Sequence, residues 1–296
     1  MICFARRVDW LRLACFSLLP PALTNSFDKW DKDSIVLHDW CASEASPCKK
    51  GLPMQEITPT RRVYRGQEEQ AEGIVIVIDV IRAFTVAAYA FGGGASGLWL
   101  VRTVEEAMAL RERDAGALLA GEIDGRLIPG FDLNNSPHMM AQADVRGRRI
   151  IQRTGAGTQG AVRAGNATHL LIASLANARA TAHYAAQLSQ SSGLPITFFP
   201  TESSAGGIQR NEDDYCADYM EALLTGSETS MDLLNERITR LYEADRFSHW
   251  GEGKNEDFPE GDLEKILAAD HFNFVMIGER KEYAGFTYVE VEKKVF

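Results

Sequence analysis

The sequence contains no long hydrophobic segment and has fewer basic than acidic side chains. Of its 296 residues, 45% are hydrophobic and 24% are charged, as in ordinary globular proteins. No run approaches the roughly 20 apolar residues that a membrane helix requires, so no membrane partner is expected. The formal net charge of −10 argues against nucleic acid, because phosphate backbones are bound by clustered Lys and Arg. A small anionic substrate is still compatible, since a pair of arginines reverses the potential inside a cleft.

Cysteine is scarce and has no metal-binding or redox spacing. Five cysteines are present, four of them in the first fifty residues, and no pair forms a C-x-x-C motif. An odd number with Cys216 alone in the main body fits a reducing compartment, so a cytoplasmic location is expected. Cys216 is expected in the core, because no histidine lies near it in the sequence. The six histidines show no ligand spacing, and none is assigned to a metal.

The first 65 residues show no sustained helix or strand period and are interpreted as a poorly ordered N-terminal extension. Residues 11–23 form an apolar stretch that faintly resembles a signal peptide. Arg12 interrupts this stretch and Pro20 breaks it, so an extension is preferred to export. Met54 is an alternative start of the protein.

Strands and helices are expected to alternate from residue 73 onward. Residues 74–78 are all Ile or Val, which is typical of a central strand buried on both faces of a mostly parallel sheet. Thr103 and Glu106 have the spacing of a capping box that opens a helix. Further strands are predicted at 98–101, 117–120, 149–152, 170–173 and 196–199, and helices at 84–91, 103–114, 177–187, 212–224 and 231–243. This alternation predicts an α/β fold with helices layered on both sides of the sheet.

The C-terminal part of the chain is expected to contain a loop followed by two strands. Residues 247–261 are polar and contain glycine, which favours a loop. Strands are predicted at 272–277 and 286–291, and the alternation of the second places it near an edge. We expect two α/β lobes, 66–165 and 166–296, with a single sheet as the alternative.

Acidic residues lie where short apolar strands end. Asp79 follows the strand over 74–78, at the position where open α/β sheets bind ligands. Glu122 follows another predicted strand, and Asp132 lies in the turn-forming segment 130–137. Magnesium takes oxygen ligands and keeps several waters, so a few carboxylates suffice to hold it. These three acids are candidate magnesium ligands, although an acid at a strand end is often a helix cap.

Two further loops are candidates for the site, and the first of them is a candidate for anion binding. Gly155 and Gly157 lie between a strand and a predicted helix, where backbone N–H groups face phosphates in other proteins, although a plain tight turn explains them equally well. The loop contains no P-loop lysine, so nucleotide binding is not inferred. Arg82 and Arg153 would supply guanidinium groups suited to phosphate or sulfonate, with surface ion pairs as the alternative. The second loop begins at Glu202, after the strand predicted at 196–199.

The acids that follow this second loop, Glu212 and Asp213, open the next predicted helix. Acidic residues in the first turn of a helix are favoured by the helix dipole alone. For this pair, a structural role is therefore at least as well supported as a catalytic one.

Taken together, these segments resemble the 2-phosphosulfolactate phosphatase family of coenzyme M biosynthesis. The resemblance rests on residues 77–83, 121–122, 130–137, 157–158, 174–178 and 212–213, which occur in the family's order. It covers roughly residues 73 to 225. It implies an α/β fold, a requirement for Mg²⁺, and hydrolysis of a phosphate monoester that carries a neighbouring sulfonate.

The resemblance and the loop patterns together give a set of candidate site residues. The catalytic candidates are Asp79, Arg82 and Asp132; the substrate-binding candidates are Arg82, Asn135, Ser136, Arg153, Thr154, Gly157 and Thr158; the metal-binding candidates are Asp79, Glu122, Asp132 and Asp213. A carboxylate would either orient a water or attack phosphorus itself, and Asp79 is the first candidate for direct attack. A phosphatase acting on another small phosphorylated acid and an inactive anion-binding protein are the alternatives. A homodimer is compatible with the sequence.

Overall fold

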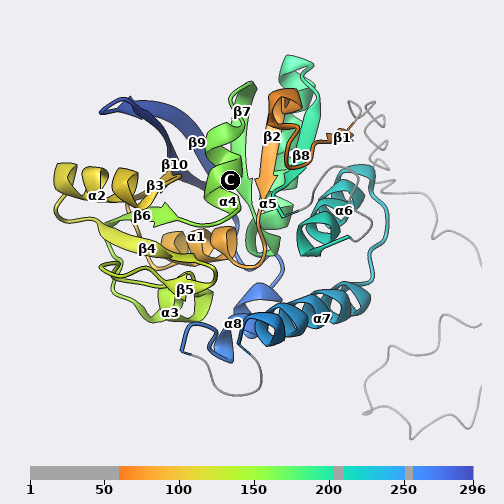
Figure 1. Ribbon diagram of the computed structural model, residues 1–296. Helices are drawn as coiled ribbons and strands as arrows, with labels where there is room; N and C mark the ends of the chain where they lie inside the picture. Colours follow the sequence, from red (N-terminus) through yellow and green to blue (C-terminus); the bar gives the residue numbers. More distant parts are fainter. Residues whose placement is uncertain (1–59, 203–209, 251–255, 296) are drawn as a thin grey trace, which may run out of the picture. The chain divides into compact units, whose positions relative to one another are not determined.

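One sheet of ten strands runs through the part of the chain that the computed structural model describes, residues 60–202, 210–250 and 256–295 (Figure 1). Its strands are β1 (Thr60–Arg62), β2 (Gly73–Ile78), β3 (Gly97–Val101), β4 (Leu118–Ile123), β5 (Arg126–Leu127), β6 (Arg149–Arg153), β7 (Ala167–Ala173), β8 (Ile196–Pro200), β9 (Phe274–Tyr283) and β10 (Phe286–Val295). Their order in the sheet is β1-β8-β2-β7-β9-β10-β3-β6-β4-β5. The predicted extension over residues 1–65 lies outside the described residues, apart from 60–65.

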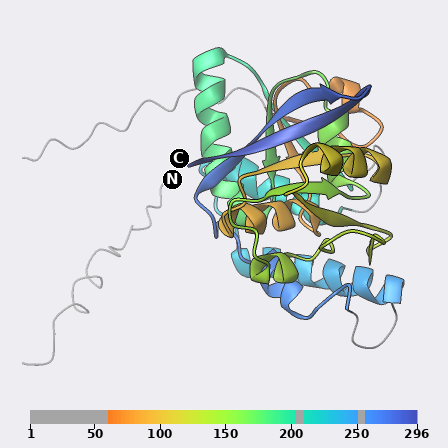
Figure 2. The ribbon, with the colours of Figure 1, turned by 90° about the vertical axis from the view of Figure 1, so that its left-hand side faces the viewer.

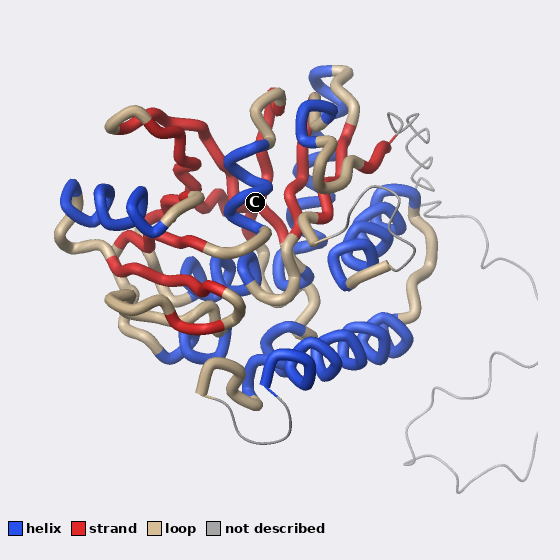
Figure 3. The backbone as a smooth tube through the Cα atoms, viewed as in Figure 1, coloured by secondary structure: helices blue, strands red, loops and turns tan. Residues whose placement is uncertain are grey.

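Helices cover both faces of this sheet (Figures 2 and 3). They are α1 (Ala83–Gly92), α2 (Val104–Arg113), α3 (Pro137–Gln142), α4 (Gly157–Arg163), α5 (Ala178–Ser192), α6 (Glu212–Thr225), α7 (Met231–Trp250) and α8 (Gly261–Ile266), with short 3₁₀ helices η1 (Glu68–Gln70) and η2 (Leu175–Asn177). The predicted α/β fold with a mostly parallel sheet is confirmed. No helix in the described part of the chain is long and apolar enough to span a membrane.

The capping box predicted at the start of α2 is present. The backbone N–H of Glu106 donates to Thr103 Oγ1 at 3.1 Å, and the N–H of Thr103 donates to the Glu106 carboxylate at 3.2 Å. Each bond satisfies an N–H group that the first helical turn leaves without a partner. A local sequence pattern therefore fixes where this helix begins.

The sheet consists of two parallel groups of strands joined by an antiparallel hairpin. Strands β8, β2 and β7 are parallel to one another, and so are β3, β6 and β4. The β9–β10 hairpin pairs antiparallel with β7 on one side and with β3 on the other. The two groups therefore run in opposite directions. The edge position predicted for 286–291 is wrong, because β10 lies in the middle of the sheet; its alternation arises because Glu290 faces Trp99 and Arg149 between two buried valines.

The two lobes predicted on either side of residue 166 share this one sheet. Strand β2 comes from the first predicted lobe, but it lies between β7 and β8, which come from the second. Of the loop predicted over 247–261, residues 256–260 form turns as predicted, whereas α7 continues to Trp250 and α8 begins at Gly261; residues 251–255 lie outside the described part of the chain. In Figure 1, α7 and α8 lie on the side towards which β2 points.

Strand β2 is buried on both faces, as its composition predicted. Ile74, Ile76 and Ile78 pack in the cluster formed with α5, α6 and α7, whereas Val75 and Val77 pack in the cluster formed with α1 and α4. Each of these side chains is fully buried. Burying one contributes about 1.5–3 kcal/mol relative to leaving it exposed, so β2 anchors both layers and fixes the residue that follows it.

Gly121 should be irreplaceable in β4. Its φ is +155°, and a Cβ atom there would overlap the carbonyl oxygen of Arg153 and lie 3.0 Å from the carbonyl carbon. We expect Gly121→Ala to lower the free energy of unfolding by about 2–3 kcal/mol, because the contacting atoms belong to the backbone of β6 and cannot rotate away. Gly116→Ala is the control, since its nearest contact is Asp114 Oδ1 at 3.4 Å. Urea titration of both variants tests this, and equal midpoints would contradict it.

Candidate active site

Asp79 lies buried at the carboxyl end of β2, with 3% of its surface exposed. Its Oδ1 accepts a hydrogen bond from the backbone N–H of Ala83 at 2.8 Å, so it caps the first turn of α1. No donor in the described residues reaches its Oδ2. Burial, and then the negative charges of Asp213 and Glu202, raise the pKa of Asp79 well above its ordinary value, against the opposing effect of the Ala83 N–H.

Gly157, the first residue of α4, approaches this free oxygen. A Cβ atom at position 157 would lie 2.5 Å from Asp79 Oδ2 and 2.9 Å from the Cβ of Ala83. Only glycine leaves room for the carboxylate here. The loop after β6 and the end of β2 therefore meet, as the glycines of this loop suggested.

Most of the polar groups in the loop after β6 are bonded to each other. The N–H of Thr154 donates to Thr158 Oγ1 at 2.9 Å, and the N–H of Thr158 donates to Thr154 Oγ1 at 3.2 Å. The N–H of Gly155 donates to Glu122 Oε1 at 2.6 Å. Among the described residues, the N–H groups of Ala156 and Gly157 have no such partner. The two threonines thus hold the loop in shape, and the two free N–H groups are the ones available to an anion.

Asp213 joins two loops at the same end of the sheet. Its Oδ1 accepts a bond from the N–H of Val80 at 2.8 Å. Its Oδ2 accepts bonds from the N–H groups of Thr201 and Glu202, both at 3.1 Å. The side chain is fully buried. In these contacts Asp213 organises the backbone after β2 and β8, and both of its oxygens already accept hydrogen bonds.

Glu212 adds a further buried acid beside this group. Burial, and then the charges of Glu202 and Asp79, raise the pKa of Glu212 to about 8. Burial, and then the charge of Glu212, likewise raise the pKa of Asp213 well above its ordinary value, although the N–H of Val80 opposes the shift. The cluster of acids is therefore strongly biased towards neutral forms as long as no cation offsets its charge.

Glu122 and Arg153 connect β4 to the loops around it. Glu122 lies within β4 rather than after it, and its Oε2 accepts a bond from the N–H of Gly125 at 2.8 Å. Its negative charge also acts on Asp79. Arg153, a predicted phosphate ligand, donates to the backbone carbonyls of Glu122 at 2.6 Å and Arg102 at 3.3 Å. In this structure Arg153 braces strand ends.

Arg82 follows Asp79 by three residues in the chain, and its side chain is held by a segment that no sequence motif marks. Its Nη1 donates to Asp262 Oδ2 at 2.9 Å and to the carbonyl oxygen of Asp257 at 2.6 Å. The ring of Phe258 covers the guanidinium at 3.8 Å. The contact with Asp262 joins residues 180 positions apart. No local sequence pattern marks this contact, because Asp262 directly follows the predicted loop over 247–261 and belongs to no motif.

Asn135 and Ser136 are both buried near this segment. Ser136 caps α3 by accepting the N–H of Met139 at 3.1 Å, and its hydroxyl donates to Asp262 Oδ1 at 2.6 Å. Asn135 is 4% exposed, and its Oδ1 has no hydrogen-bond partner among the described residues. Ser136 is thus connected to Arg82 through Asp262, and Asn135 holds an unused acceptor.

Asp132 makes its contacts elsewhere. Its Oδ2 accepts bonds from Arg111 Nη1 at 2.7 Å and from the N–H of Leu119 at 2.8 Å, and the residue is exposed. Partial burial would raise the pKa of Asp132, but the Leu119 N–H and the Arg111 charge outweigh that effect and hold it below its ordinary value. These contacts tie the turn-rich segment to α2 and β4 and do not join Asp132 to the buried acids.

A metal ion at this site would have few protein ligands. In the described part of the chain, no three His, Cys, Asp or Glu side chains are arranged to hold a metal between them. Magnesium is commonly held by one or two carboxylates, with waters and substrate phosphate completing its shell. Asp79 Oδ2 is a carboxylate oxygen that accepts no hydrogen bond within the described residues.

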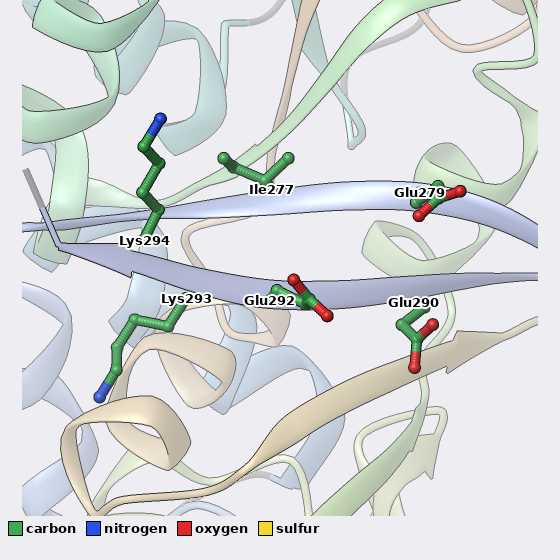
Figure 4. A pocket seen from close by; sticks show the side chains of 6 residues that line it. All are labelled: Ile277, Glu279, Glu290, Glu292, Lys293 and Lys294. Carbon is green, nitrogen blue, oxygen red and sulfur yellow. The ribbon is translucent and has the colours of Figure 1, made fainter.

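A separate cavity of about 300 Å³ lies on the β9–β10 hairpin (Figure 4). It is lined by Ile277, Glu279, Glu290, Glu292, Lys293 and Lys294. None of the predicted site residues lines it. Several of its charged groups already have partners, since Lys294 Nζ contacts the Tyr184 hydroxyl at 3.2 Å and Lys293 Nζ the Phe91 carbonyl at 3.1 Å. We therefore place the candidate active site around Asp79.

Several proteins of known sequence resemble this chain. A protein of Bacillus subtilis named as a probable 2-phosphosulfolactate phosphatase is 38% identical over 181 residues, which cover 60% of this chain and 76% of that protein. A protein of the same name from Deinococcus radiodurans is 40% identical over 151 residues, covering 51% of this chain and 62% of that protein. One from Thermus thermophilus is 41% identical over 127 residues, covering 43% and 53%.

A family model agrees with these relatives. The model described as 2-phosphosulpholactate phosphatase matches residues 62–280, which include every strand from β2 to β8 and all the site residues discussed above. The resemblance seen in the sequence motifs is thereby confirmed, and the chain belongs to the 2-phosphosulfolactate phosphatase family.

Proposed function

We propose that this protein is a magnesium-dependent phosphatase that hydrolyses 2-phosphosulfolactate to sulfolactate and phosphate. The observation that carries the proposal is the free Oδ2 of Asp79, a buried carboxylate oxygen at the end of a central strand in a member of this family. Phosphoryl transfer needs positioned charge and a positioned nucleophile, and this oxygen would serve in one of these roles.

The balance of charge supports a requirement for magnesium. Asp79, Glu212 and Asp213 are buried together, and the charge of Arg82 is offset by Asp262. An anionic substrate would therefore meet a site without net positive charge. A bound Mg²⁺ would supply the charge that stabilises phosphate oxygens during transfer. Asp79 would be its ligand, and Glu122 and Asp213 are the further candidate ligands from the predicted set.

The remaining roles follow from groups that the chain leaves free. The N–H groups of Ala156 and Gly157 and the unfixed edge of the Arg82 guanidinium would bind the non-bridging phosphate oxygens. Asn135 Oδ1, a buried acceptor without a partner, would orient a water or a hydroxyl group. Asp79 would attack phosphorus or direct a water, and both routes need its ionised form.

The proposal extends to the setting of the reaction. We place the protein in the cytoplasm and in coenzyme M biosynthesis, where it would act on a small anionic phosphorylated acid. We expect no nucleic acid as a partner, and a homodimer is compatible with the proposal. The net charge of −10 and the family support this setting.

A second candidate is a phosphatase for a small phosphorylated acid without a sulfonate. Arg153 favours it, because this arginine donates to two backbone carbonyls rather than standing free for a second anionic group. Turnover of a phosphorylated acid lacking the sulfonate, at a kcat/KM above that for 2-phosphosulfolactate, would select this alternative. An inactive anion-binding protein would turn over neither compound.

Phosphate release from 2-phosphosulfolactate by the purified full chain tests the proposal. We expect release with Mg²⁺ and none with EDTA. Asp79→Asn keeps the shape of the side chain but removes the anionic oxygen, so kcat/KM should fall by about 10³-fold or more. Asp144→Asn, an exposed acid, is the control and should stay within about twofold. Full activity in EDTA would contradict the requirement for magnesium. Full activity of Asp79→Asn would contradict the catalytic role of Asp79.

Magnesium binding should also be visible without substrate. An ion that binds the folded state alone raises the free energy of unfolding by about 2.7 kcal/mol at a concentration 100 times its Kd. We expect Mg²⁺ to raise the melting temperature of the wild-type protein and to have little effect on Asp79→Asn. Thermal denaturation at a series of Mg²⁺ concentrations measures this. Equal shifts in the two proteins would show that the ion binds elsewhere.

Asp132 should stabilise the fold through its contacts with Arg111 and Leu119. Because its folded pKa is lowered, its stabilising effect is present above the unfolded pKa and is lost as the pH falls through the folded one. We expect Asp132→Asn to lower the free energy of unfolding by about 0.5–1 kcal/mol at pH 7, a value reduced by solvent screening, and by less below about pH 4. Urea titrations at both pH values check this. A loss of turnover as large as that of Asp79→Asn would instead place Asp132 in the active site.

A further inference from the structure

Arg82, three residues after Asp79 in the chain, forms a buried ion pair with Asp262. The two side chains are 3% and 0% exposed, and Arg82 Nη1 lies 2.9 Å from Asp262 Oδ2. The same nitrogen donates to the carbonyl oxygen of Asp257, so both of its N–H groups are used. The ring of Phe258 covers the face of the guanidinium. One corner of this planar group is thus fixed in position and in tilt.

The rest of the guanidinium keeps donors free. Nη2 contacts the carbonyl oxygen of Gly125 at 3.5 Å, which is long for a hydrogen bond. No hydrogen bond from Nε occurs within the described residues. Arg82 also directly precedes α1, whose first N–H group, that of Ala83, binds Asp79. Arg82 therefore belongs to the same short segment as the candidate nucleophile, and Nε and Nη2 are the donors of its guanidinium that remain available.

Asp262 is itself held from both sides. Its Oδ1 accepts the hydroxyl of Ser136 at 2.6 Å and the N–H of His138 at 3.0 Å, which leaves Oδ2 for Arg82. Gly261, the preceding residue, packs against the His138 ring so closely that a Cβ atom there would overlap it. A buried carboxylate with this many donors has one orientation and imposes it on its partner.

We propose that Asp262 is a positioning residue, which holds the Arg82 guanidinium so that its free N–H groups bind the phosphate group of the substrate. The inference rests on the proposed function, in which Arg82 binds phosphate. It makes a prediction of definite sign. If Asp262 only offset the charge of Arg82, its removal would strengthen the binding of anions; if it positions Arg82, its removal weakens that binding.

The binding of inorganic phosphate to the full chain, measured by calorimetry in the presence of Mg²⁺, distinguishes these effects. Asp262→Asn retains the size of the side chain and an acceptor for Ser136, but it removes the charge that fixes Arg82. We expect the Kd for phosphate to rise by about 10-fold or more, and kcat/KM to fall by about 100-fold, mainly through KM. A Kd that is unchanged or lower would overturn the inference, as would a wild-type protein that binds no phosphate.

A double-mutant cycle shows whether Asp262 acts through Arg82. In the background of Arg82→Lys, we expect Asp262→Asn to change the Kd by less than about twofold, because the planar group it positions is gone. Effects that multiply independently would overturn the inference. Asp270→Asn is the matched control. Asp270 forms its ion pair with Arg179, at 2.9 Å, and not with Arg82, so this substitution should leave the Kd unchanged.

A further variant covers the case in which Asp262→Asn does not fold. Asp262→Glu keeps the charge but moves the carboxylate, so it should also weaken phosphate binding, and a Kd equal to that of the wild type would overturn the inference. Circular dichroism verifies that each variant is folded. Because the cycle is measured by binding, it remains decisive if the wild-type protein releases no phosphate from 2-phosphosulfolactate, a result that would refute the proposed function alone.

Discussion

The hydrogen bonds of Asp213 fix the geometry on which the candidate site depends. Its carboxylate accepts N–H groups from the segment after β2 and from the segment after β8, two strands that are neighbours in the sheet. Val80 directly follows Asp79, so this contact also fixes the residue with the free oxygen. A buried carboxylate that satisfies several backbone donors is costly to replace, because each donor would lose its partner.

Much of the fold could be predicted because local sequence patterns determine its strands and helix starts. The unbroken run of Ile and Val in β2 reports burial on both faces, and Thr103 with Glu106 reports the start of α2. The position of the β9–β10 hairpin could not be predicted in this way. Its strands are separated by more than 170 residues from β3, with which β10 pairs, and strand alternation reports the exposure of a face rather than the place of a strand in a sheet.

The site residues also divide into those that a local sequence pattern marks and those that only distant contacts bring together. Asp79 and Gly157 were predicted from a strand end and from the glycines of a loop, because the carboxyl ends of strands are where chains leave a sheet. Asp213 was predicted from the family resemblance, at the start of a predicted helix. Asp262 was missed, since its importance comes from a contact with a residue 180 positions away and its own surroundings in the sequence suggest a loop. Asp132 shows the converse. A motif marks it, but its partners in the structure are Arg111 and Leu119.

Under the proposed function, the buried acids and the paired arginine argue that a bound cation and the substrate strengthen each other's binding. Without a cation, burial favours the neutral forms of Asp79 and Asp213, and a protonated Asp79 can neither attack phosphorus nor accept a proton from water. With a cation but no phosphate, the free N–H groups of the loop after β6 have no anion to bind. Under the proposed function, the negative oxygens of the substrate phosphate would contact both the cation and the fixed guanidinium. The cation would offset the charge of the acids, and the phosphate would bind the free N–H groups. This would explain why a site that binds an anion contains so many acids.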